Sequence, residues 1–228
     1  MQDESLGISS ELGMRPLMER VLDRKLELQG VPSMAPRTSI DSVASAVTSE
    51  RPDLRSHTAP DGTVTILFSD IEGFTRLTVR LGDRRAQRVL RGHNDIVRRN
   101  VATYRGFEVK SLGDGFMLAF SSARRALQCA IGMQRAFAAR NQEHPEEPLW
   151  VRIGLHTGEF VQEKEDFFGK NVILASRIAD QAQGGEILVS SPLKELTESS
   201  GDIRFGEAQE MDLKGLAGSN RVYPVEWK

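Results

Sequence analysis

The sequence lacks several features that define common protein classes. It holds one cysteine, Cys129, in 228 residues, so no disulfide can form within the chain, as is typical of proteins in a reducing compartment. It has no run of about 18 apolar residues to span a membrane, and no apolar signal-peptide region at its start. Its net charge of −2 argues against a dedicated nucleic-acid surface. We therefore expect a cytoplasmic protein without a membrane span or a nucleic-acid partner.

The chain divides by composition into an extension, residues 1–60, and a globular domain, residues 61–228. Apolar residues near helical spacing predict an amphipathic helix over residues 12–28, ended by a glycine and a proline. Residues 31–60 are rich in Ser, Thr, Ala and Pro with little periodicity, which predicts a flexible linker. The helix either packs on its own domain or acts as a dimerising or regulatory element, and its pattern leaves both open.

The globular domain opens with residues 63–77, TVTILFSDIEGFTRL. The apolar, β-branched first half predicts a central strand that is covered on both faces. Asp70 stands where this strand ends, in a position that does not suit a core residue. Gly73, Phe74 and Thr75 then begin a helix whose first N–H groups lack intrahelical partners and could hold phosphate. A metal-bound triphosphate suits both features.

A second carboxylate lies in residues 107–120, FEVKSLGDGFMLAF, which predict a β-hairpin with Asp114 at its tip. If Asp70 and Asp114 converge, they repel each other and one pKa rises, unless a divalent cation holds them together. Each residue alone has a simpler interpretation. Asp-Gly is common hairpin turn chemistry, and Asp70 could cap a helix.

The order of elements predicts the fold. A helix over residues 76–104, with a break at Gly82, precedes the hairpin; a helix over 123–140 and a strand over 150–157 follow it. Strand, helix, hairpin, helix, strand is the split βαβ pattern of ferredoxin-like α+β folds, with helices on one face of the sheet. Further elements are predicted to follow it: a helix over 169–183, a strand over 186–190, a short helix over 192–198 and short strands over 203–227.

Five stretches of this domain occur together in a recognisable order: FSDIEGFTRL, VKSLGDGFMLAF, VRIGLHTGE, FFGKNVILASRI and GEILVSS. In these motifs the chain resembles the class III nucleotidyl cyclases, the catalytic domains of adenylate and guanylate cyclases, over residues 63–227. The resemblance implies a cyclase-type ferredoxin-like sheet. It also implies a soluble homodimer with two shared active sites.

The resemblance implies a role for each candidate residue in cyclising a nucleoside triphosphate. Asp70 and Asp114 bind two Mg²⁺ or Mn²⁺ ions, with the Ile71 carbonyl as a further ligand. The N–H groups at residues 73–75 hold phosphate, and Lys214 adds a cation to the outer phosphates. Asp70 and Asp114 serve from one chain of the dimer, and the groups that read the base come from the other.

Base choice is implied by two positions. Lys110 and Asp166 match the family's adenine-reading pair, whereas guanylate cyclases usually place a glutamate and a small polar or thiol residue there. A lysine can only donate and a carboxylate can only accept, which suits a ring nitrogen and the exocyclic amine of adenine. Arg177 matches the arginine that stabilises the transition state, although Asp180, three residues on, could simply pair with it. The implied activity is conversion of ATP to 3′,5′-cyclic AMP and pyrophosphate.

One position departs from the family. Ile173 stands four residues before Arg177, where an asparagine usually orients the ribose, and isoleucine cannot form that hydrogen bond. Lys170 lies on the same helical face, whereas Asn171 points to a different side. This departure leaves open a degenerate cyclase-fold module that binds ATP or dimerises with little turnover. A guanylate cyclase is a further alternative, which requires that the two base-reading positions are misaligned.

Overall fold

The computed structural model describes residues 38–159, 165–213, 216 and 218–228. The contacts divide the chain into a unit of residues 1–38 and a unit of residues 39–228, and the fold below is that of the second unit. The helix predicted at 12–28 lies outside the described residues. Every helix within the described ranges is too short or too polar to span a membrane.

A single mixed sheet forms the centre of the domain. Its strands occur in the order β2 (Phe107–Leu112), β3 (Gly115–Phe120), β1 (Thr63–Ile71), β4 (Val151–Glu159), β5 (Ile187–Ser190), β8 (Ser219–Glu226) and β6 (Arg204–Phe205), with β7 (Gln209–Asp212) also paired to β8. Among the strands of the described ranges, only β4 and β5 pair in parallel. The central β1 is buried along nearly its whole length, as its apolar, β-branched sequence predicts.

The helices of the ferredoxin-like pattern occur in the predicted order. They are α4 (Phe74–Leu81), α5 (Asp83–Thr103), α6 (Ala123–Glu143), α7 (Glu165–Gln181) and α8 (Ser191–Glu198). The predicted break in the first helix is confirmed, because Gly82 has φ 74°, a left-handed conformation that glycine adopts without strain. The turn between β2 and β3 likewise contains Gly113 with φ 63°.

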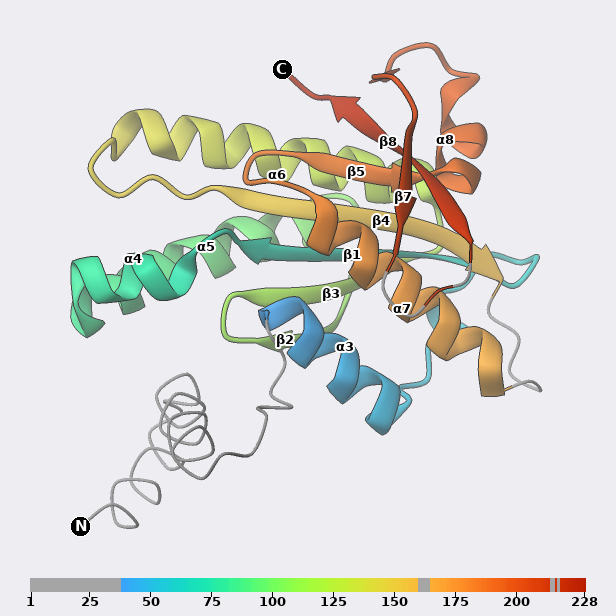
Figure 1. The fold of residues 1–228 in the computed structure, drawn as a ribbon, viewed down its shortest axis with the longest axis horizontal. Helices are drawn as coiled ribbons and strands as arrows, with labels where there is room; N and C mark the ends of the chain where they lie inside the picture. The colour runs from blue at the N-terminus through green and yellow to red at the C-terminus, as the bar shows by residue number, and fades with distance from the viewer. Residues whose placement is uncertain (1–37, 160–164, 214–215, 217) are drawn as a thin grey trace. The chain divides into compact units, whose positions relative to one another are not determined.

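The helices cover both faces of the sheet, so the expectation of helices on one face is wrong. Leu67 of β1 belongs to a core with α5 and α6, whereas Ile66 and Phe68 belong to a separate core with α3 (Ser39–Glu50) and α7. Figure 1 shows α3 and α7 on the opposite side of the sheet from α6. The physical reason is the strand itself, because β1 presents apolar side chains in both directions.

The helix α3 also corrects the prediction of a linker over residues 31–60. Ile40, Val43, Ala44 and Val47 are buried at positions i, i+3, i+4 and i+7, which is the spacing of an amphipathic helix. The small and hydroxylated residues between them hide this pattern in the composition. Residues Ser39–Glu50 therefore form a helix that packs on the sheet.

Two histidines are buried in the domain. His93 of α5 stacks on Phe137 with a ring-centroid distance of 5.3 Å and lies 5.8 Å from the ring of Phe116. Burial lowers the pKa of His93 from its ordinary 6.5 to about 4, and burial lowers that of His156 in β4 to about 4 as well. Both side chains are therefore neutral in the folded protein at neutral pH.

The buried histidines predict a loss of stability in mild acid. Above pH 6.5 each is neutral in both states, and as the pH falls towards 4 the unfolded chain binds the proton first. We expect His93→Phe to remove the part of this loss that comes from His93. The free energy of unfolding of the variant minus that of the parent should therefore rise by about 2 kcal/mol when the pH falls from 6.5 to 5. Urea unfolding at the two pH values measures it. An unfolding free-energy difference that is the same at both would contradict a buried neutral His93.

Candidate functional site

Asp70 and Asp114 lie together at one end of β1. The pairing of β1 with β3 ends at Ser69 and Phe116, so the β2–β3 turn that carries Asp114 lies beside the end of β1. The backbone N–H of Ile71 donates to Asp114 Oδ2 at 3.3 Å. Asp70 is 4% exposed and Asp114 3%. The structure thus brings together the two carboxylates that the sequence analysis paired.

The negative charges of this carboxylate pair are only partly compensated by neighbouring groups. Burial and the negative charge of Asp70 raise the pKa of Asp114 well above its usual range. Arg152 of β4 donates from Nη2 to Asp70 Oδ2 at 2.7 Å, and Ser39 Oγ donates to Asp114 Oδ1 at 2.5 Å. The other oxygen of Asp70, Oδ1, is buried without a hydrogen-bond partner. A buried, unpartnered carboxylate oxygen is costly, and a bound cation would compensate for it.

The residues present fit a hard divalent cation. Carboxylate oxygens suit Mg²⁺ and Mn²⁺, and a cation between them would lower the pKa of Asp114 and satisfy Asp70 Oδ1. No group of three or more His, Cys, Asp or Glu side chains arranged to hold a metal occurs in the described part of the chain. Further ligands must therefore come from backbone carbonyls such as that of Ile71, from water or from a substrate.

The start of α4 follows this site directly. Gly73 has φ 68° and occupies the N-cap position, and no side chain caps the helix there. An added Cβ at Gly73 would lie 3.3 Å from Arg76 Nη2, so a guanidinium group lies close to the same turn. N–H groups without a capping side chain, beside a cation, suit an anionic group, which is how the sequence analysis interpreted residues 73–75.

Lys110 and Arg177 both form ion pairs with α3. Lys110 Nζ donates to the two carboxylate oxygens of Glu50 at 2.6 and 2.8 Å. Arg177 Nη1 donates to Asp41 Oδ1 at 2.5 Å and to Asp180 Oδ2 at 3.2 Å, so the simple pairing with Asp180 is also present. Lys110 and Arg177, two of the side chains predicted to bind the nucleotide, therefore form ion pairs with carboxylates of the same chain.

Four other positions complete the comparison with the predicted site. Asp166 lies in the first turn of α7, where the structure describes the backbone alone, and Lys214 lies outside the described residues. Ile173 is half-buried on α7. Asn171 donates to the Glu159 carbonyl at 2.8 Å and contacts His156 Nε2 at 3.2 Å. Asn171 therefore faces β4 and does not replace the asparagine that Ile173 displaces.

Comparison with known proteins decides the family. A model of the family described as Adenylate and Guanylate cyclase catalytic domain matches residues 57–226. The chain belongs to this family. The resemblance to class III cyclases is thereby confirmed, as is the cyclase type of the fold. Catalytic domains of this family generally depend on divalent metal ions.

Individual relatives of the cyclase domain are moderately similar. The putative adenylate cyclase 3 of Rhizobium meliloti is 30% identical over 152 residues, which cover 66% of this chain and 26% of that protein. The adenylyl cyclase CyaB from P. aeruginosa superposes with a TM-score of 0.62 at 25% identity, covering 72% of this chain and 93% of that one. The guanylyl cyclase Cya2 superposes equally well, with a TM-score of 0.62 at 26% identity over 72% of this chain and 91% of that one. Similarity alone therefore does not decide between ATP and GTP as the substrate.

Several contacts of this cyclase domain were not predicted from the sequence. Arg152 pairs with Asp70 across the β1–β4 register and also lies 3.7 Å from Asp180. Ser39, Asp41 and Glu50 approach the site from α3. An arginine inside an otherwise apolar strand was a signal for the first, whereas the α3 residues lay in the segment interpreted as linker.

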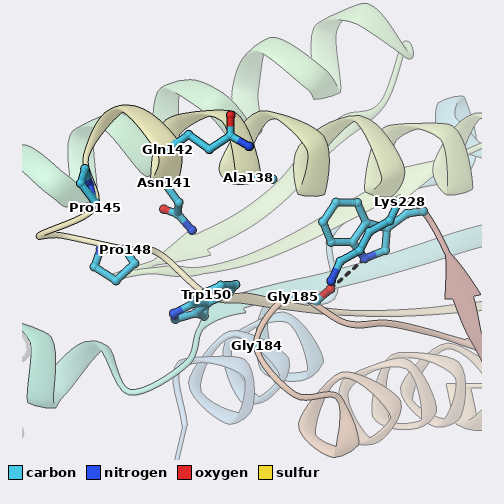
Figure 2. A pocket seen from close by; sticks show the side chains of 10 residues that line it. Ala138, Asn141, Gln142, Pro145, Pro148, Trp150, Gly184, Gly185 and Lys228 are labelled. Atoms are coloured by element: carbon cyan, nitrogen blue, oxygen red, sulfur yellow. Dashed lines mark hydrogen bonds between the residues drawn. The ribbon is translucent and has the colours of Figure 1, made fainter.

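A separate hollow of about 510 Å³ lies between the end of α6, the start of β4 and the C-terminus. Figure 2 shows Trp150, Pro148 and Asn141 around it. Trp227 Nε1 donates to the Gly185 carbonyl at 2.8 Å beside it. Its lining contains no Asp or Glu side chain and none of the predicted cyclase site residues. The candidate site is therefore the carboxylate pair and not this hollow.

The carboxylate pair predicts stabilisation by metal. Mn²⁺ at 100 times its dissociation constant should raise the free energy of unfolding by about 3 kcal/mol, because the folded site binds it and the unfolded chain does not. Asp70→Asn should abolish the increase, and Asp95→Asn, an exposed carboxylate on α5, should retain it. Thermal unfolding with and without Mn²⁺ measures both. An equal increase in Asp70→Asn would place the metal elsewhere.

Proposed function

We propose that this cyclase domain is an adenylate cyclase, which converts ATP to 3′,5′-cyclic AMP and pyrophosphate. The observation that carries the proposal is the buried pair Asp70 and Asp114, with an unpartnered Asp70 oxygen, directly before the uncapped start of α4. A pair of carboxylates beside a helix start that no side chain caps is suited to a metal-bound triphosphate. Both features lie at one end of β1, so a single substrate could contact them together.

In the reaction, the ribose 3′-oxygen forms a bond to the α-phosphorus, the bond to the β-phosphate oxygen breaks, and the 3′-hydroxyl proton is released. Asp70, Asp114 and the Ile71 carbonyl would hold two Mg²⁺ or Mn²⁺ ions, which supply activation of the hydroxyl and neutralisation of the phosphates. The N–H groups at residues 73–75 bind phosphate oxygens. Lys214 donates to the outer phosphates, where charge accumulates as pyrophosphate leaves.

Adenine recognition is assigned to two side chains of opposite hydrogen-bonding character. Lys110 donates to a ring nitrogen, and Asp166 accepts from the exocyclic amine. Guanine presents the opposite arrangement on that edge, so the same pair would leave two polar groups unmatched. Arg177 donates to the α-phosphoryl oxygens as they gain charge, for which its planar guanidinium is suited.

The active sites are proposed to be shared in a homodimer. Asp70 and Asp114 serve one site from one chain, while Lys110, Asp166 and Arg177 serve it from the other. The resemblance to class III cyclases supports this arrangement. A protomer alone then holds two half-sites and is inactive.

A degenerate nucleotide-binding module is the second candidate, favoured by Ile173. Its side chain cannot orient the ribose, and Asn171 is engaged with β4. The intact carboxylate pair argues for turnover, because a module that only dimerises has no need of two buried aspartates. Guanylate cyclase activity is a third outcome of the test below.

Turnover with each nucleotide separates these candidates. We expect cyclic AMP from ATP with Mn²⁺, little cyclic GMP from GTP, and a loss of at least about 10²-fold in Asp70→Ala, since the metal ligand set is broken. Product formation by the purified full chain is the measurement. Faster turnover of GTP would refute the base assignment. ATP binding without product would favour the degenerate module.

Mixing two inactive variants tests the shared site. Asp70→Ala lacks the metal half of each site and Arg177→Ala lacks the other half, so the mixed dimer regains one intact site of two. Equal mixing should restore about a quarter of the parent cyclic AMP production, because half of the dimers are mixed. The same Asp70→Ala chain mixed with Asp114→Ala is the control and should remain inactive. No recovery in the first mixture would argue against sites shared in this way.

A further inference from the structure

The two carboxylates of α3 lie on the cations that the proposed function gives to the nucleotide. Asp41, in the first turn of α3, pairs with Arg177 at 2.5 Å, and Glu50, its last residue, pairs with Lys110 at 2.6 Å. Arg177 lies on α7 and Lys110 on β2, so one helix reaches both from opposite ends. A carboxylate on each cation occupies the position that a phosphoryl oxygen or adenine nitrogen would need.

The first residue of α3 contacts the metal half of the site. Ser39 Oγ donates to Asp114 Oδ1 at 2.5 Å. A Cβ added at Gly115 would lie 2.9 Å from Ser39 Cβ and 3.0 Å from its backbone carbonyl, so α3 rests directly on the hairpin turn. A side chain at position 115 would push the helix away. The start of α3 therefore lies where a ligand of Asp114 would approach.

The remaining face of α3 is apolar and covers the sheet. Ile40, Val43 and Val47 are almost completely buried in a core that includes Phe68 of β1 and Met117 of β3. Figure 1 shows α3 beside α7 on this face of the sheet. Without α3, the face would expose a contiguous apolar surface, which a second copy of the chain could cover.

We propose that α3 is an autoinhibitory helix that covers both the nucleotide groups and the face on which a second copy docks. This inference rests on the proposed function. ATP, its metal ions and the second copy displace α3, because together they replace its ion pairs and its apolar contacts. The chain shown here is the closed state, and its half-sites are held by its own carboxylates.

The chain turns sharply after α3. Arg51 has φ 46° and is followed by Pro52, which ends the helix abruptly. Leu54, two residues later, is fully buried in the same core as the apolar face of α3 and Phe68 of β1. In the open state, rotation at residues 51–53 would move α3 away from the sheet while Leu54 keeps its contact with β1.

A matched pair of glutamate substitutions in the full chain tests whether α3 is autoinhibitory. Val43→Glu places a charge on the buried face of α3, and Ser45→Glu places the same charge on its exposed face. We expect Val43→Glu to raise cyclic AMP production at subsaturating ATP on the order of 10-fold and to raise the dimer fraction in sedimentation, because the competent state becomes populated. Ser45→Glu should match the parent.

A second variant protects the test against misfolding. Asp41→Asn with Glu50→Gln keeps the shape of α3 and removes these two charges, so Arg177 and Lys110 lose their ion pairs with α3. We expect its affinity for a fluorescent ATP analogue with Mn²⁺ to rise on the order of 10-fold. If this variant and Val43→Glu are both no more active and bind no tighter than Ser45→Glu, α3 is a structural helix and the proposal is overturned.

The same measurements test the autoinhibitory role of α3 separately from the proposed cyclase activity. If no variant makes cyclic AMP but Val43→Glu binds the analogue more tightly than Ser45→Glu, the autoinhibitory role of α3 is supported and the proposed cyclase activity fails. If the parent is fully active and no variant exceeds it, the proposed cyclase activity is supported and the autoinhibitory role of α3 fails.

Discussion

The domain depends on the confinement of two carboxylates at one end of its central strand. Asp70 and Asp114 are buried side by side, and burial with like charge raises the pKa of Asp114. Arg152 compensates one oxygen of Asp70 and leaves the other without a partner. This incomplete compensation is what a metal site requires, since a fully satisfied pair would have no free ligand oxygen.

The same charge balance explains the position of α3. The carboxylates at its two ends neutralise Arg177 and Lys110, while Ser39 donates to Asp114. In the proposed function a nucleotide with its metal ions would bring other partners to the same groups: a phosphoryl oxygen to Arg177, an adenine ring nitrogen to Lys110 and a metal ion to the aspartates. A helix with these contacts therefore competes with the substrate and packs on the sheet as well.

The sequence predicts those parts of the fold and site whose signals are local. The apolar run before Asp70, the Gly-Asp-Gly turn and the glycine break after α4 each lie within a few residues, and all appear where expected. Arg152 meets Asp70 from 82 residues away, and Lys110 meets Glu50 from 60, so only the folded register brings them together. The α3 pattern is local, but serines and alanines obscure it. Helices on both faces follow from that missed helix and from α7.

Hydrogen exchange of the α3 amides is the most direct test of the central claim, that the nucleotide and α3 compete for one site. The full chain would be compared alone and with Mn²⁺ and an ATP analogue that cannot cyclise. We expect faster exchange over residues 39–50 and slower exchange at the hairpin turn around Asp114 when the analogue is bound. Unchanged or stronger protection of residues 39–50 with the analogue bound at the turn would contradict it.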